Sequence, residues 1–253
     1  MVSVGIDIGS TATKAVVFDG MVRGRAVVPT GWEPREAGLR AFREALSSAG
    51  LREESVSRVV GTGYGRVSLP FSDQRVTEIS CHARGAWYLN PDTRAVIDIG
   101  GQDSKVILVS DDGSVSDFIM NDKCAAGTGR FLQVMAGILD LTLDELGSLA
   151  ASSEPVPLTS MCTVFAESEI IGLLAQGTPK GAIAAGIIDA IARRMEGLVG
   201  RLEAHEGITF TGGLATNGSI SGVIARRLGL SLHVPEDPQI VGALGAALIG
   251  CNA

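Results

Sequence analysis

The sequence lacks several features that mark common classes of protein. Its longest apolar run, residues 241–251, is far shorter than the ~20 residues of a membrane-spanning helix. Its first ten residues carry no basic segment followed by an apolar stretch. It also has no run of lysine or arginine, and its formal net charge is −7, which disfavours nucleic acid and acidic membranes as partners. We therefore expect a cytoplasmic protein that binds neither.

Cysteine is scarce and is not paired at short spacing. The four cysteines stand at positions 81, 124, 162 and 251, and no C-x-x-C motif is present. This pattern differs from the dense frameworks of small secreted domains, so we expect no disulfide bonds. Free cysteines in a reducing compartment are usually small buried apolar residues, and this interpretation is the starting point for each of the four.

Two common nucleotide-binding motifs are also missing. The sequence contains neither G-x-x-x-x-G-K-[ST] nor a G-x-G-x-x-G after a strand, so P-loop and Rossmann proteins are excluded. What is present is 45% hydrophobic residues, 19% charged residues and 33 glycines in a chain of 253 residues. This composition is typical of an α/β protein with many tight turns, and the length suits two modest domains.

The hydrophobic pattern predicts a similar series of strands and helices twice. The first series has strands at 3–8, 12–18, 22–28 and 58–63 and helices at 35–48 and 77–89. The second has strands at 94–100, 104–110, 113–120, 207–213 and 231–234, and helices after residue 129, within 178–205, at 217–228 and from 239 onward. The long helix has Thr178 as its expected N-cap and Pro179 as its first residue. We expect an α/β protein with two duplicated lobes, residues 1–92 and 93–253, whose last helix (239–253) packs back toward a hinge.

Two short stretches carry the duplication most clearly. DIGSTATK (7–14) and DIGGQDSK (98–105) share Asp, Ile, Gly and the final Lys. A glycine at such a turn lets backbone N–H groups approach phosphate oxygens, and a carboxylate at the strand end suits Mg²⁺ held through water. One copy alone fits a plain hairpin equally well, but two copies favour phosphate binding.

A third glycine pair, in FTGGLATN (210–217), again follows a strand and precedes a helix, which suits the adenosine or the α-phosphate. The candidate nucleotide-binding residues are Asp7, Gly9, Ser10, Thr11, Ala12, Thr13, Lys14, Gly100, Gly101, Gln102, Gly127, Gly129, Gly212, Gly213 and Asn217.

Together with VGALGAALIG (241–250), these three stretches resemble the actin, sugar kinase and heat-shock chaperone ATPase superfamily. The resemblance covers nearly the whole chain and implies two ribonuclease-H-like lobes that bind Mg-ATP in the cleft between them. For hydrolysis we expect Asp7 and Asp98 to hold Mg²⁺ through water and Gln102 to position the attacking water. The alternative for Gln102 is a polar residue at a strand edge.

Cys124 and Cys162 lie in a different setting from the other two cysteines. They occur in NDKCAAGTGRFL and CTVFAESE, each just before an expected helix start. Helix N-termini stabilise a thiolate, and a [4Fe–4S] cluster takes four thiolates, which two copies in a twofold dimer would supply. Spacing alone favours two unrelated buried thiols, and the ligand type would also suit zinc.

These two cysteine stretches, with DIGGQDSK and GIDIGSTATK, closely resemble the activator ATPases (component A) of 2-hydroxyacyl-CoA dehydratases, in the BadF/BadG/BcrA/BcrD ATPase family. The resemblance implies one [4Fe–4S] cluster that bridges a homodimer through Cys124 and Cys162. It also implies ATP-driven transfer of one electron to a dehydratase, supplied by an external reductant such as ferredoxin or flavodoxin. Cys81 and Cys251 match no ligand motif and are expected to be structural.

Other functions fit parts of the same pattern. A close relative of the activators donates electrons to a double-cubane-cluster protein or acts as a benzoyl-CoA reductase-type subunit. A small-molecule kinase or an actin-like filament subunit would use the same fold but would give Cys124 and Cys162 no role. Glu167 and Glu169 fit contacts with ribose or with the water shell of the metal, or equally the solvated carboxylates of a first helical turn.

Overall fold

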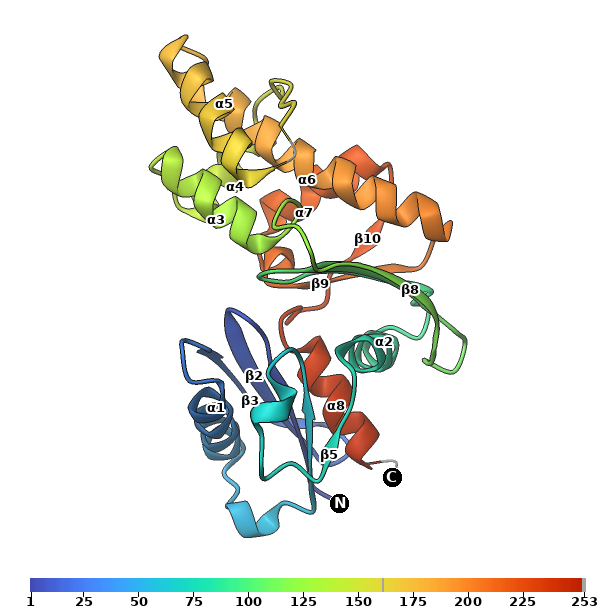
Figure 1. Cartoon of the computed structure of the whole chain (residues 1–253). Helices are drawn as coiled ribbons and strands as arrows, with labels where there is room; N and C mark the ends of the chain where they lie inside the picture. The colour runs from blue at the N-terminus through green and yellow to red at the C-terminus, as the bar shows by residue number, and fades with distance from the viewer. Residues whose placement is uncertain (161, 252–253) are drawn as a thin grey trace. The chain divides into compact units, whose positions relative to one another are not determined.

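The computed structural model describes residues 1–160 and 162–251, which form two five-stranded sheets with associated helices (Figure 1). The strands are β1 (Ser3–Ile8), β2 (Ala12–Phe18), β3 (Val22–Pro29), β4 (Arg58–Thr62), β5 (Gln74–Arg75), β6 (Ala95–Ile99), β7 (Ser104–Val109), β8 (Val115–Asn121), β9 (Ile208–Gly212) and β10 (Leu232–His233). The α-helices are α1 (Pro34–Ala49), α2 (Glu78–Leu89), α3 (Gly129–Ile138), α4 (Leu143–Ala151), α5 (Thr163–Ala175), α6 (Lys180–Leu202), α7 (Gly218–Leu228) and α8 (Val241–Cys251). Short 3₁₀ helices are η1 (Glu53–Ser55), η2 (Arg66–Ser68) and η3 (Leu214–Thr216). None of the helices within the described ranges is both long and apolar enough to span a bilayer.

The chain divides into two compact units. Unit 1 comprises Met1–Val96, Ile107–Phe118 and the described residues from Pro235 onward, and unit 2 comprises Ile97–Val106 and Ile119–Val234. This division differs from the single boundary between residues 92 and 93 that the sequence suggested. The reason is that α8 packs against α2, β1 and β4, so the C-terminal segment joins the N-terminal strands.

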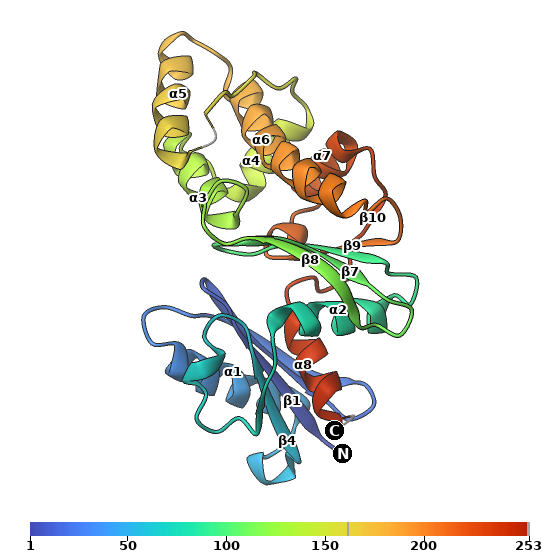
Figure 2. The same cartoon turned by 45° about the vertical axis from the view of Figure 1, so that its right-hand side comes forward.

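The sheet of unit 1 has the strand order β3-β2-β1-β4-β5. β1 and β3 pair antiparallel with β2, whereas β4 pairs parallel with β1 and with β5. Successive side chains of a strand point to opposite faces. Accordingly, Ala15 and Val17 pack in the cluster with α1, and Val16 and Phe18 pack in the cluster with α8. The two helices therefore cover opposite faces of this sheet (Figure 2).

Small residues let α8 lie very close to its neighbours. A β-carbon at Gly5 of β1 would collide with the backbone carbonyl of Ala243, and one at Gly245 would collide with the carbonyl of Cys81 on α2. The repeated glycine and alanine of VGALGAALIG therefore serve close packing, and every α8 residue from Val241 to Leu248 is buried.

The second sheet repeats the strand order of the first. Its order is β10-β9-β6-β7-β8, so the first, second and third strands of the second series occupy the same places as β1, β2 and β3. In unit 2, α4, α6 and α7 pack on one another, and α3 packs against α5. The expected duplicated α/β architecture is confirmed.

Two expectations about helices were wrong or incomplete. Thr178 is not the N-cap of α6, because its N–H bonds to Leu173 O at 3.0 Å and completes the C-terminal turn of α5; Pro179 is the N-cap, with an extended ψ of 135°. Helix α4 was not expected, although Thr142 and Glu145 form a capping box at its start.

Candidate functional site

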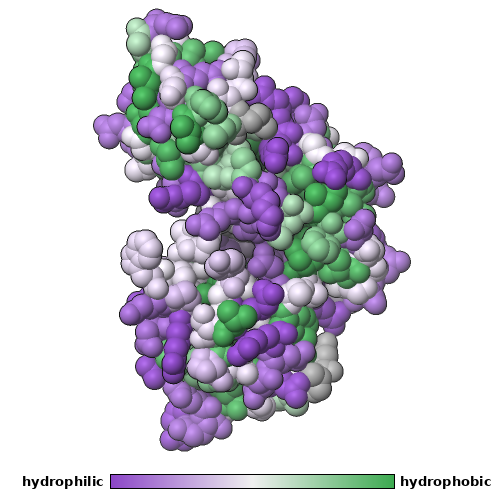
Figure 3. All heavy atoms as spheres, viewed as in Figure 1, coloured by the Kyte–Doolittle hydropathy of each residue, from purple (hydrophilic) through white to green (hydrophobic). Residues whose placement is uncertain are grey.

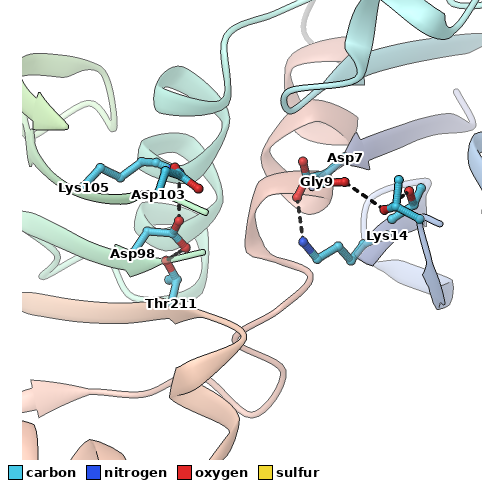
Figure 4. A network of polar contacts seen from close by, with 9 residues as sticks. Asp7, Gly9, Lys14, Asp98, Asp103, Lys105 and Thr211 are labelled. Carbon is cyan, nitrogen blue, oxygen red and sulfur yellow. Dashed lines mark hydrogen bonds and ion pairs between the residues drawn. The ribbon is translucent and has the colours of Figure 1, made fainter. Parts of the chain in front are cut away.

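The first D-I-G turn joins β1 to β2 in unit 1. Asp7 and Lys14 are cross-strand neighbours in the hairpin, and Lys14 Nζ lies 3.3 Å from Asp7 Oδ2 (Figure 4). The turn is closed by a hydrogen bond from Gly9 N to Ala12 O at 3.2 Å. Asp7 is only 5% exposed, so this carboxylate is held by the fold and is not a mobile surface group.

Hydrogen bonds of two threonine hydroxyls stabilise this turn. Thr13 is fully buried, its hydroxyl lies 2.9 Å from that of Thr30, and Thr30 Oγ1 donates to Gly9 O at 2.8 Å. Thr13 therefore stabilises the turn, and its expected contact with a phosphate stays a prediction. Ser10 is half-buried and Thr11 exposed, so their hydroxyls are more accessible.

Glycines from two other elements leave room for the Asp7 carboxylate. Gly63, with φ +82°, follows β4, and a β-carbon there would collide with Asp7 Oδ1 and Ile8 O. A β-carbon at Gly242 would lie 3.2 Å from Asp7 Oδ2 and 2.9 Å from His82 Nε2. The sequence alone did not single out His82, which is 6% exposed and faces the same glycine as the motif carboxylate.

The second D-I-G turn, in unit 2, repeats this arrangement with more partners. Lys105 Nζ lies 2.9 Å from Asp98 Oδ2 and also pairs with Asp103. Thr211, at the end of β9, donates to Asp98 Oδ1 at 2.8 Å, and Gly212 adopts φ +93° beside it (Figure 4). Neither Asp103 nor Thr211 was among the predicted site residues, although the shared final lysine of the two stretches was a signal for the ion pair.

The other expected nucleotide-binding residues of unit 2 fall into two groups. Gln102 and Gly213 are exposed, which is compatible with contacts to water or a ligand. Asn217 instead caps α7, because its Oδ1 accepts from Ile220 N at 2.9 Å and its Nδ2 donates to Asp144 Oδ1 at 2.7 Å. Any contact between Asn217 and a nucleotide stays a prediction.

The second motif is bonded directly to the first turn of α3. Gly129 N donates to Gly100 O at 2.9 Å, and Arg130 N donates to Gly101 O at 2.8 Å. The N–H of Gly129 is thus already occupied, so its expected contact with phosphate also stays a prediction. The bonds connect the second D-I-G motif to the chain segment that carries Cys124.

The four cysteines have distinct environments. Cys81 is buried, and burial raises the pKa of its thiol to about 12. Cys124 is half-buried in the turn before α3, Cys162 is exposed at the N-cap of α5, and Cys251 is half-buried at the end of α8. A single copy brings together no group of three or more His, Cys, Asp or Glu suited to a metal ion within the described part of the chain.

Apolar side chains surround the start of α5. Val164 is 68% exposed and Phe165 67% exposed, directly after Cys162. Hydrophobic side chains gather on the surface over α3 and α5 (Figure 3). An exposed apolar patch of this kind is typical of a surface that another protein covers.

Glu169 has a role that the sequence did not suggest. Its carboxylate accepts hydrogen bonds from Thr159 N at 2.8 Å, Thr159 Oγ1 at 2.9 Å and Ser160 N at 2.9 Å. Burial raises the pKa of Glu169, but these bonds outweigh it and hold the pKa below its ordinary value. Glu169 thus anchors the segment that leads to Cys162, whereas Glu167 is exposed.

Two sheets with one strand order, each with an Asp–Lys pair on its first hairpin, define a duplicated ATPase of the actin-like superfamily. The chain belongs to the BadF/BadG/BcrA/BcrD ATPase family, whose model matches residues 4–250. It is 44% identical to the (R)-2-hydroxyglutaryl-CoA dehydratase activating ATPase of Acidaminococcus fermentans, over 97% of this chain and 95% of that protein. It is 42% identical to the 2-hydroxyisocaproyl-CoA dehydratase activator of Clostridioides difficile, over 98% of this chain and 94% of that protein.

Solved structures agree with this assignment. The activator of the 2-hydroxyisocaproyl-CoA dehydratase from Clostridium difficile with bound ADPNP superposes with a TM-score of 0.93 at 41% identity, over 100% of this chain and 95% of that one. A ROK family glucokinase from Streptomyces griseus reaches a TM-score of 0.61 at 15% identity, over 100% of both chains. The latter likeness shows the fold alone.

Proposed function

We propose that this chain is an ATP-dependent activator that delivers one electron to a 2-hydroxyacyl-CoA dehydratase. The observation that carries the proposal is similarity over nearly the full length to two proteins, one named as an activator and one as an activating ATPase of a 2-hydroxyacyl-CoA dehydratase. The setting of Cys124 and Cys162 supports it, because a kinase or a filament subunit would not require these two thiols.

For ATP hydrolysis, we propose that the turn of residues 9–12 and the Lys14 ammonium bind the phosphates. The side chain of Lys14 remains 16% exposed beside Asp7, so it can approach an incoming anion. Asp7 and Asp98 would contact Mg²⁺ through its water ligands, and Gln102 would orient the attacking water. Each carboxylate has its oxygens partly occupied by lysine or threonine, which fits contact through water better than direct ligation.

For electron transfer, we propose that Cys124 and Cys162 of two copies hold one [4Fe–4S] cluster. One copy supplies two thiols on segments before the packed helices α3 and α5, so half of a four-thiolate set is present in each chain. The exposed Val164 and Phe165 fit burial against the second copy. Such a cluster, when bound, accepts and releases single electrons.

The electron balance requires two protein partners. A ferredoxin or flavodoxin supplies one electron, and the dehydratase accepts it while ATP and water are converted to ADP and phosphate. In unit 2, the bonds from Gly129 and Arg130 to the second D-I-G motif give the nucleotide state a mechanical route to the Cys124 segment.

The test is an oxygen-free preparation of the wild-type chain and of Cys124→Ser and Cys162→Ser. We expect about four irons per two chains in the wild type, and ATP-dependent activation of a purified 2-hydroxyacyl-CoA dehydratase in the presence of reduced ferredoxin. Each of the two variants should lose the iron and the activation. Cys251→Ser, a matched change at a half-buried cysteine, should keep both. If the oxygen-free wild-type protein is monomeric and colourless, or binds zinc through these sulfurs, the electron-transfer role is wrong and only the ATPase activity remains.

A further inference from the structure

Helix α6 carries two consecutive arginines that reach toward the two cysteine segments. Arg193 Nη2 donates to Leu158 O at 3.0 Å, in the segment that leads to Cys162. Arg194 Nη2 donates to the Oδ1 of Asn121 at 3.3 Å, at the end of the strand that leads to Cys124. Both arginines lie in the long helix predicted within 178–205, but neither was assigned a function from the sequence.

Asn121 fixes the backbone around Cys124. It is 7% exposed, and its Nδ2 donates to Cys124 O at 2.9 Å and to Ala126 O at 3.2 Å. The carbonyl between them, of Ala125, accepts from Thr128 Oγ1 at 2.6 Å. Three successive carbonyls of this turn are therefore bonded, which leaves the backbone at Cys124 little freedom to move.

The same turn packs against the aliphatic part of the Arg194 side chain. Gly127 adopts φ +87°, and a β-carbon there would lie 2.9 Å from Arg194 Cγ. The arginine thus supports the turn in two ways, through the bond to Asn121 and through contact at Gly127. A side chain at position 127 would push this turn away from α6.

The Cys162 segment is held by a second set of bonds. Besides the bond from Arg193 to Leu158 O, the Glu169 carboxylate accepts from the next two residues, Thr159 and Ser160. Arg193 is itself anchored, because its guanidinium lies 3.2 Å from Asp189 one turn earlier on α6. The segment is therefore bonded to both α5 and α6.

We infer that Arg193 and Arg194 are positioning residues that fix the two cysteine segments on one rigid helix, so that both thiolates of a copy meet the same cluster. The inference rests on the proposed function, because it assigns the arginines a role toward the [4Fe–4S] group. A guanidinium suits this role, because its planar fork reaches a carbonyl or amide oxygen with a fixed geometry. The two arginines are adjacent in sequence, so a single helix sets the spacing of both segments.

The experiment measures how firmly iron is held in oxygen-free protein. Wild type, Arg194→Ala, Arg193→Ala and the control Arg201→Ala are mixed with an iron chelator, and the rate of iron loss, the EPR spectrum of the reduced state and the melting temperature are recorded. Arg201 is an exposed arginine in the last turn of the same helix. For Arg194→Ala we expect iron loss about tenfold faster than in the wild type, because the loss of one hydrogen bond to a charged group has about that effect on an equilibrium. The EPR spectrum of this variant should also change. Arg193→Ala should show the same direction of change, and Arg201→Ala the wild-type rate.

Asn121→Asp keeps the test decisive if Arg194→Ala does not fold. It preserves the shape of the side chain and the bond with Arg194, but it removes the two N–H bonds to Cys124 O and Ala126 O. Faster iron loss in this variant, with Arg194 intact, supports the inference. Wild-type rates and spectra in Asn121→Asp and in both arginine variants overturn it. Wild-type protein that contains no iron is a separate outcome and contradicts the proposed function.

Discussion

In unit 1, Lys14 pairs with one carboxylate at 3.3 Å and keeps 16% of its side chain exposed. In unit 2, Lys105 pairs with both Asp98 and Asp103 and keeps 3%. The two hairpins otherwise match closely, because Gly9 N bonds to Ala12 O and Gly100 N bonds to Asp103 O. The difference that changes the pairing of the lysine is one side chain, Ala12 in the first turn and Asp103 in the second.

This difference suggests different roles for the two D-I-G motifs of one chain. A buried lysine between two carboxylates is neutralised by the protein itself and has little attraction left for phosphate. A half-buried lysine with one carboxylate retains access to an anion. We infer that the first turn binds the charge of the nucleotide, whereas the Lys105 network mainly keeps the second motif rigid.

The largest expected effect is on stability, at Lys105. Lys105→Met leaves the buried Asp98 and the half-buried Asp103 without their cation. Removal of one partner of a buried ion pair costs about 3–5 kcal/mol. Lys14→Met should cost less, because Lys14 has one carboxylate partner instead of two and its side chain is 16% exposed. Urea unfolding of both variants measures the difference, and equal losses would contradict the proposed division.

The next effect is on catalysis, at Lys14. Lys14→Met should lower the kcat of ATP hydrolysis about 100-fold, the usual scale for the loss of one charged group that stabilises the transition state. Steady-state phosphate release measures it. Lys123→Met removes a lysine that is 89% exposed and should leave the rate unchanged. A Lys14→Met enzyme with normal turnover would show that the phosphates bind elsewhere.

A smaller effect comes from copying the second turn into the first. Ala12→Asp places a carboxylate where Asp103 stands in the other hairpin, so it should neutralise Lys14 and raise the KM for ATP about tenfold. Ala12→Asn has nearly the same shape without the charge and serves as the control. If both variants have the same KM, shape and not charge distinguishes the two turns.

The local elements could be predicted from the sequence because their signals are local. Apolar alternation placed β1 and β2 at their observed bounds, and the repeated D-I-G stretch predicted the duplicated sheets. The signal for α4 was also present, as the Thr142 and Glu145 capping box, but a helix of nine residues has a weak periodic pattern. Thr178 was wrongly predicted as the N-cap of α6, because a threonine between two helices can belong to the last turn of the first or to the start of the second.

The long-range partners could not be predicted in the same way. His82 and Asp7 meet only because α8 brings Gly242 against both, and Arg194 meets Asn121 only because α6 packs beside the Cys124 turn. No spacing in the chain encodes these contacts. They follow from tertiary packing, and local sequence patterns do not reveal which side chains it brings into contact.

The smallest effect concerns a buried thiol in unit 1. At the end of β9, Thr211 donates to Asp98, whereas at the end of β4 the Thr62 hydroxyl has no hydrogen-bond partner within the described residues. Thr62 lies beside Cys81, whose thiol is buried. Burial raises the pKa of Cys81 to about 12 from an unfolded value of 9.0. The fold therefore favours the protonated thiol, and its contribution is complete below pH 9 and is lost as the pH rises toward 12. From pH 8 to about 9.5 the free energy of unfolding should fall by about 0.8 kcal/mol through this group alone. Urea unfolding of wild type and Cys81→Ala isolates the term, because the variant should lack this part of the slope while Cys251→Ala keeps it. Parallel slopes in wild type and Cys81→Ala would show that the thiol ionises as easily in the folded chain as in the unfolded one.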